Sequence, residues 1–184
     1  MTQRIHRVAA IVALGATVLV SACGTSAGSG GSLPAEPVES IGPGRTVSPA
    51  VNQTRIELLR ALGAHNLVLT DTQAPVRPAE ASLLAAAPRA VYQVILPKDP
   101  SHGYIVVYEF PDPGSAAAAA AQQQAYLATG PARVQTPLGT VSIIRQVGST
   151  VVLYDWLPAG SPDDSTPGIQ AALETLGVGF PVAS

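Results

Sequence analysis

Four short segments of this chain of 184 residues are rich in apolar side chains, many of them β-branched or aromatic. Residues 90–96 and 104–110 form one pair of such segments, and residues 140–147 and 150–157 form the other. Short runs of this kind bounded by turn residues predict β-strands, and two neighbouring strands predict a hairpin. Gly148 and Ser149 lie between the second pair and fit a two-residue loop with a positive φ at the glycine.

Helical patterns follow each predicted hairpin. Asp112 can cap a helix that begins at Pro113, continues through the alanines 116–121 and ends near residue 128. A second helix is expected over residues 167–176, before a glycine. Ahead of the hairpins, the pattern predicts a helix over residues 51–62, a short strand over 65–70 and a short helix over 78–87. The first of these has one apolar face, made of Val51, Leu58, Leu59 and Leu62.

The two hairpins resemble each other in sequence. Residues 105–110 read IVVYEF, and residues 151–156, which lie 46 positions later, read VVLYDW. Gly114 and Ser115 match Gly160 and Ser161 at the same shift. Such self-similarity predicts an internal duplication of a ββα unit, over residues 90–130 and 136–177.

Two ββα units in tandem predict an α+β domain with a four-stranded antiparallel sheet and helices packed on one face, because such crossovers are right-handed. The expected strand order is 90–96, 104–110, 150–157, 140–147, with residues 51–89 as an additional N-terminal helical segment. This order resembles a circular permutation of the ferredoxin-like fold. The fold alone indicates no function.

Strand periodicity and hairpin register predict which side chains share a face. With Val147 opposite Thr150 and Leu96 opposite Tyr104, one face carries the aromatic rings and packs beneath the alanine-rich helices. The other face is either covered by residues 51–87 or open to a partner. That face is the candidate site for a ligand or partner, and its residues are Val107, Glu109, Leu153, Asp155, Gln93 and Gln146.

The first 20 residues have the pattern of a signal peptide. Arg4, His6 and Arg7 precede an apolar run over residues 8–20. A membrane-spanning helix needs about 20 apolar residues, so this shorter run is typical of a secretory leader.

The leader is followed by Val20-Ser21-Ala22-Cys23, which resembles the lipobox of bacterial lipoprotein precursors. The resemblance implies cleavage between Ala22 and Cys23 and attachment of lipid, including fatty acyl chains such as palmitate, to Cys23. Two or more acyl chains would anchor the protein stably to a membrane of the cell envelope, on an extracytoplasmic side. Residues 1–22 are therefore the expected signal peptide, 23–50 the lipidated cysteine with a Gly/Ser/Pro tether, and 51–184 a single α+β domain.

Charge and cysteine content narrow the possible partners. Loss of Arg4 and Arg7 with the leader leaves 8 of the 10 basic residues against 12 acidic ones, a net charge of −4. An acidic chain without a basic stripe argues against nucleic acid as a partner. The single cysteine is assigned to the lipid, so no metal site and no cofactor beyond that covalent lipid are expected.

Two sets of residues could suggest catalysis. Glu109 and Asp155 occupy equivalent positions in the two repeats, and paired carboxylates can share acid and base roles in a hydrolase. Asp99, Ser101 and His102 contain the residue types of a triad, but three neighbours in one turn cannot align as nucleophile, base and orienter.

The sequence therefore predicts a membrane-anchored extracytoplasmic lipoprotein that is not an enzyme. Its expected role is that of a binding or accessory module for an envelope partner or a small apolar ligand. A hydrolase using Glu109 and Asp155 is one alternative, and a purely structural envelope lipoprotein is another.

Overall fold

The computed structural model describes residues 47–182. The predicted signal peptide, Cys23 and the tether up to residue 46 lie outside the described residues.

A six-stranded antiparallel sheet forms the centre of the described chain, in the order β1-β2-β3-β5-β4-β6. The strands are β1 (Leu69–Asp71), β2 (Arg89–Val94), β3 (Tyr104–Glu109), β4 (Val141–Val147), β5 (Thr150–Trp156) and β6 (Val178–Gly179). The helices are α1 (Pro49–Gly63), α2 (Ser82–Ala86), α3 (Pro113–Leu127), α4 (Gly130–Gln135) and α5 (Thr166–Glu174), and η1 (Pro158–Gly160) is a short 3-10 turn.

The α+β class is confirmed, and the four central strands have the predicted order. The predicted four-stranded sheet is wrong, because a short strand is added at each edge. β1 pairs with β2, and β6 pairs with β4 where the Arg145 guanidinium donates to the Leu176 carbonyl. The short strand predicted over residues 65–70 overlaps β1 but was not assigned to the sheet, and β6, at two residues, is too short to show a period-two pattern.

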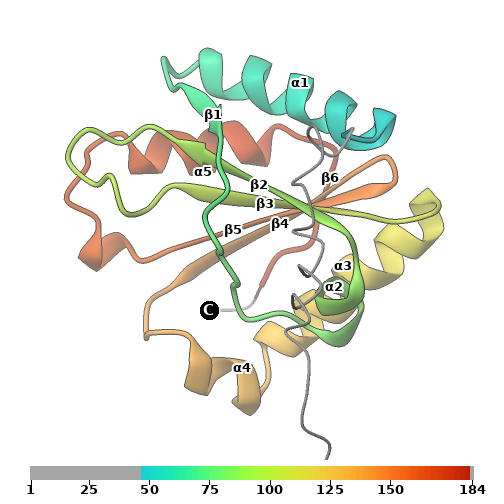
Figure 1. Cartoon of the computed structure of the whole chain (residues 1–184). Helices are drawn as coiled ribbons and strands as arrows, with labels where there is room; N and C mark the ends of the chain where they lie inside the picture. The colour runs from blue at the N-terminus through green and yellow to red at the C-terminus, as the bar shows by residue number, and fades with distance from the viewer. Residues whose placement is uncertain (1–46, 183–184) are drawn as a thin grey trace, which may run out of the picture. The chain divides into compact units, whose positions relative to one another are not determined.

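Helices cover both faces of the sheet (Figure 1). α1 and α5 pack on one face, around Ile105, Val107 and Tyr154. α2, α3 and α4 pack on the other, around Val106, Tyr108 and Leu153. The prediction that the helices lie on one face is therefore wrong, and the described domain has a sheet between two helical layers.

Local sequence explains where the two long helices begin. The Ser48 side chain accepts from the Val51 amide at 3.2 Å, and the Asp112 carboxylate accepts from the Ser115 amide at 2.9 Å. In both helices a proline follows the capping residue. An N–H at this position has no acceptor within the helix, so proline loses no hydrogen bond there. The alanines of α3 that face the sheet are fully buried and leave room for the Tyr108 ring.

The second hairpin has the predicted register. Val147 lies opposite Thr150, and Gly148 has a φ of +56°. The first hairpin does not, because Gln93, rather than Leu96, lies opposite Tyr104. This odd-numbered slip of three positions places Tyr92 on the face opposite to Tyr108.

The contact between the two hairpins also differs from the prediction. Ile105 lies opposite Tyr154, and Tyr108 lies opposite Val151. Residues related by the 46-position shift therefore point to opposite faces, and so do the helices that follow them, α3 and α5. The prediction that all the aromatic rings share one face is wrong. Tyr108 and Phe110 pack with α3, whereas Tyr154 and Trp156 pack on the side of α1 and α5. A duplication of ββα units is not confirmed.

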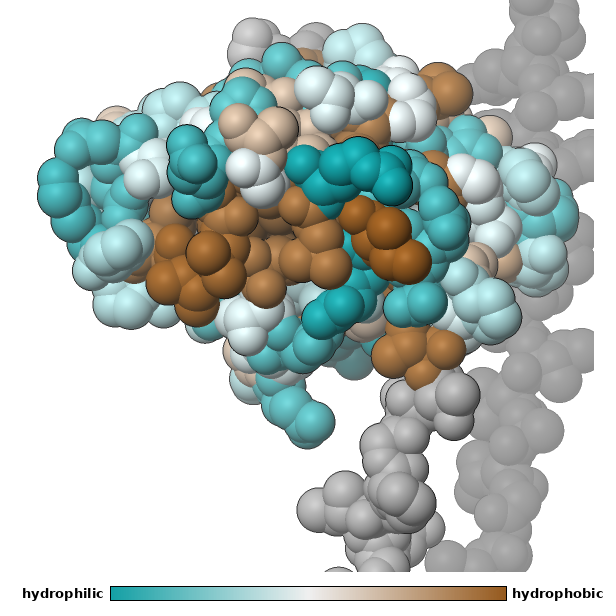
Figure 2. Space-filling model, turned by 90° about the horizontal axis from the view of Figure 1, so that it is seen from above, coloured by the Kyte–Doolittle hydropathy of each residue, from teal (hydrophilic) through white to brown (hydrophobic). Residues whose placement is uncertain are grey.

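Apolar side chains also reach the surface on the side covered by α1, where Figure 2 shows them gathered in a band. α1 presents two large exposed aliphatic side chains, Ile56 and Leu59. Leu59 was predicted to share the buried face of this helix, but it is 39% exposed.

Candidate functional site

Two cavities open beside the carboxyl end of β5. The larger has a volume of about 320 Å³ and is here called the Asp155 cavity. The smaller, of about 90 Å³, is called the Ser161 cavity. Four residues line both, namely His102, Asp155, Trp156 and Leu157.

The Asp155 cavity combines an apolar lining with a few polar groups. Val106 and Leu153 of the sheet lie against it, and Val76 and Ala79 contribute from the stretch between β1 and α2. That stretch crosses from the helical layer of α1 to that of α2 (Figure 1). Arg77, Thr136 and Thr140 add polar groups. Such a mixed lining, at a volume near the lower end of the usual range, is typical of small-molecule sites.

Asp155 is the half-buried acid of this cavity. It lies opposite Ser142 of β4, on the sheet face of Leu153. Its Oδ1 atom is shielded from solvent and has no hydrogen-bond partner among the described residues. Burial raises the pKa of Asp155 to about 6, against the opposing effect of the Ser142 hydroxyl. A carboxyl group in this state is poorly solvated when charged.

Trp156 is the neighbouring residue and points to the opposite face of the sheet. Its indole Nε1 is also buried and unpartnered within the described part of the chain. Buried polar atoms without partners cost free energy, so these two atoms, on opposite faces at the end of β5, mark places where a ligand or water could bind.

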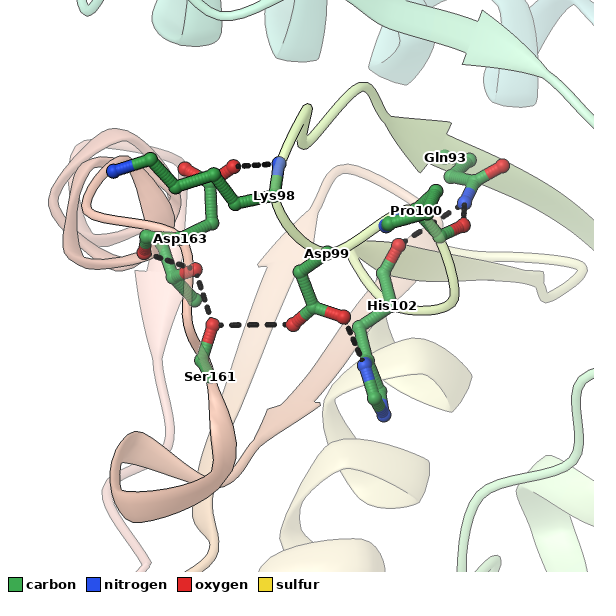
Figure 3. A network of polar contacts seen from close by, with 8 residues as sticks. Gln93, Lys98, Asp99, Pro100, His102, Ser161 and Asp163 are labelled. Atoms are coloured by element: carbon green, nitrogen blue, oxygen red, sulfur yellow. Dashed lines mark hydrogen bonds and ion pairs between the residues drawn. The ribbon is translucent and has the colours of Figure 1, made fainter.

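A polar network borders the Ser161 cavity (Figure 3). The His102 Nδ1 and the Asp99 Oδ1 lie 2.5 Å apart, and the Ser161 hydroxyl donates to Asp99 Oδ2 at 3.2 Å. The Ser161 and Thr166 hydroxyls are 2.7 Å apart. The Asp99 side chain is 7% exposed, whereas that of His102 is 69% exposed. The buried carboxylate therefore orients an accessible imidazole.

The β2–β3 loop that carries Asp99 and His102 is held at both sides. The Gln93 amide donates to the carbonyls of Pro100 and His102, at 2.9 and 3.1 Å (Figure 3). On the other side, the Lys98 backbone N–H donates to Asp163 at 2.9 Å. This bond and a similar one from the Ser165 N–H lower the pKa of Asp163.

The network does not have the order of a serine-protease triad. Asp99 lies between His102 and Ser161, so the hydroxyl that contacts the carboxylate is not paired with the imidazole. The side-chain hydrogen bonds that join these residues do not include Ser101. Within residues 47–182, no group of three or more potential metal-ligating side chains comes together.

The two predicted carboxylates are not brought together. Glu109 lies opposite Thr150, at the far end of the β3–β5 pair from Asp155 and on the other face of the sheet. Along the strand direction, Glu109 and Asp155 are five residue positions apart, which corresponds to about 17 Å. Glu109 and Asp155 cannot act as an acid and base on one substrate in this arrangement.

The rest of the predicted ligand face is also divided. Val107 and Leu153 are buried, at 0% and 1% exposure, and lie in the cores on opposite sides of the sheet. Gln93 holds the β2–β3 loop, and the Gln146 amide donates to the carbonyls of Pro113 and Gly148 at 2.7 and 3.0 Å. Of the predicted residues, Asp155 and Leu153 line the Asp155 cavity, and the others do not.

Comparison with protein-family models, with curated proteins and with solved structures finds no match for this chain. Among the helices of the described residues, none is long and apolar enough to cross a membrane.

Proposed function

We propose that this chain is a membrane-anchored extracytoplasmic protein that binds a small, largely apolar ligand in the Asp155 cavity, without catalysing a reaction. The observation that carries the proposal is the cavity itself, which has an apolar wall of sheet residues and an acid with one buried, unpartnered oxygen. The anchor in this proposal is the lipid on Cys23, which the lipobox pattern predicts.

The geometry of the polar groups favours binding over hydrolysis. Glu109 and Asp155 are far apart, and no imidazole among the described residues pairs with the Ser161 hydroxyl. The alternative of a purely structural lipoprotein draws support from the covered sheet, since helices pack on both faces. Ligand binding at the cavity separates these two roles.

Trp156 offers a direct readout because it is the only tryptophan of the chain and lines the cavity. We expect cyclohexylmethanol, a neutral and ultraviolet-transparent probe, to cause a saturable change in tryptophan emission of the full-length protein in detergent. Absence of a saturable change with any small apolar probe would favour the structural role.

A matched pair of variants tests the location. Thr140→Phe places a ring in the cavity wall, whereas Thr175→Phe lies elsewhere on the surface. Each replacement removes the same kind of bond, from a threonine hydroxyl to the carbonyl three residues earlier. Thr140→Phe should weaken binding and Thr175→Phe should not; equal effects would contradict binding in this cavity.

A further inference from the structure

We infer that the Asp155 cavity selects ligands that carry a primary amine on an apolar group, with the ammonium bound by the Asp155 carboxylate. This inference rests on the proposed function and specifies the chemistry of its ligand.

The first argument is the missing partner of Asp155. Its Oδ1 accepts no hydrogen bond, and no ion pair within residues 47–182 includes this residue. A buried carboxylate is stabilised by an opposite charge or by N–H donors. A ligand ammonium supplies both in one group.

The second argument is the charge of the surroundings. The other ionisable side chains that line the two cavities are Arg77, His102, Tyr104, Tyr154 and Asp99. Asp99 is already engaged by His102 and Ser161, and Arg77 is exposed to solvent without an ion pair to Asp155. Within the described residues, Asp155 is thus the acid of the cavity that lacks a cationic partner.

The third argument is the apolar wall. Val106 and Leu153 lie on the same sheet face as Asp155 and line the same cavity. A ligand whose ammonium reaches Asp155 can therefore lay an aliphatic body against these side chains. An inorganic cation would leave this apolar surface uncovered.

The test compares two probes of nearly the same shape. Cyclohexylmethylamine and cyclohexylmethanol are titrated into the full-length protein in detergent at pH 8, and Trp156 emission reports binding. Because hydrogen bonds to a charged group are the strong ones, we expect the amine to bind about tenfold more tightly than the alcohol, or better. Equal affinities would overturn the inference and leave the proposed function intact, whereas absence of binding by both would overturn both.

Variants assign the preference to one carboxylate. Asp155→Asn should reduce the ratio of amine to alcohol affinity to about one while the alcohol still binds. Glu109→Gln is the matched control, because this carboxyl group lies on the other face at the far end of the strand pair. A preference that survives in Asp155→Asn would contradict the assignment.

The pH dependence of the unmodified protein gives a second readout if Asp155→Asn folds poorly. Protonation of Asp155 near pH 6 removes the anion that the ammonium needs, so the preference for the amine should disappear at pH 5. His102 lines the same cavity, so the comparison is repeated in His102→Gln. A preference that persists at pH 5, or a pH effect abolished by His102→Gln, would count against Asp155.

Discussion

The phenolic hydroxyl of Tyr108 donates a hydrogen bond to the Glu80 carboxylate, with 2.6 Å between the two oxygens. The same carboxylate oxygen pairs with the Arg89 guanidinium at 2.7 Å, and only 5% of the Glu80 side chain is exposed. Burial and this bond raise the pKa of Tyr108, so the hydroxyl stays a donor throughout the working pH range. Glu80 thereby joins the stretch before α2 to two strands of the sheet.

Replacing Tyr108 by Phe should destabilise the protein, because it leaves the buried Glu80 carboxylate with one donor fewer. We expect the free energy of unfolding to fall by about 1 to 3 kcal/mol, the usual cost when a buried partner is lost. Chemical denaturation followed by circular dichroism measures this change. Tyr126→Phe is the control, since the Tyr126 hydroxyl accepts only an exposed bond from Gln135, and its effect should stay within about 0.5 kcal/mol. Equal losses in the two variants would contradict a special role for the Glu80 contact.

Gly177 marks the point where the chain turns into the edge strand β6. Its φ is +32°, and a Cβ placed there would lie 1.9 Å from the backbone oxygen of Gln146. A backbone neighbour cannot move aside as a flexible side chain can, so Gly177→Ala should cost roughly 2 to 4 kcal/mol or detach β6. Hydrogen exchange at the β4–β6 pair distinguishes the two outcomes. Gly63→Ala, which meets no atom within 4 Å, should change stability by less than about 1 kcal/mol.

The parts of the fold that depend on neighbouring residues could be predicted from the sequence. The caps at Asp112 and the two-residue loop at Gly148 fix their elements locally, and the register of the second hairpin follows from that loop. The order of the four central strands was predicted from the two hairpins together with the right-handed crossover between them.

The faces of the sheet could not be predicted in the same way. The β2–β3 loop is long and does not fix the register. A pairing of Leu96 with Tyr104 buries apolar side chains on both faces as well as the observed pairing of Gln93 with Tyr104 does. The contact of β3 with β5 joins segments separated by more than forty residues, and every residue from Ile105 to Tyr108 is apolar. Because both faces are buried, hydrophobicity does not distinguish the two registers.

The candidate site depends on such long-range contacts. Asp155 was a predicted site residue, but its partner in that prediction, Glu109, lies at the opposite end of the β3–β5 pair. The contact of His102 with Asp99 is local, whereas Ser161 reaches Asp99 from 62 residues away. No spacing pattern in the sequence indicates that second contact.

The membrane anchor is a separate prediction, carried by Cys23. Cys23→Ala should move the protein from the membrane fraction to unprocessed or soluble forms, because the thiol that receives the lipid is gone. Cell fractionation and intact mass measure the two effects. Ser26→Ala, a replacement three residues later in the tether, should leave both unchanged. A Cys23→Ala protein with unchanged mass and membrane fraction would refute the anchor.

Asp155 should also give the protein an unusual dependence of stability on pH. Its pKa is about 6 in the folded state and 3.8 for an unperturbed carboxyl group, so the folded state binds this proton more tightly. The contribution of Asp155 to the free energy of unfolding is therefore fully present below about pH 4 and is lost as the pH rises to about 6. Asp155→Asn should remove this component and raise the stability at pH 7 by up to about 3 kcal/mol.

The opposite sign is expected at Asp163, whose pKa is lowered by N–H donors from Lys98 and Ser165. Its stabilising effect is present at neutral pH and is lost in acid, so Asp163→Asn should lower the stability at pH 7. Urea denaturation of both variants at pH 4, 5, 6 and 7 compares the two profiles. A stabilised Asp155→Asn protein would show that the cavity keeps an acid at the expense of stability, as expected where a residue serves a ligand rather than the fold. A less stable variant with an unchanged pH profile would instead assign Asp155 to the fold.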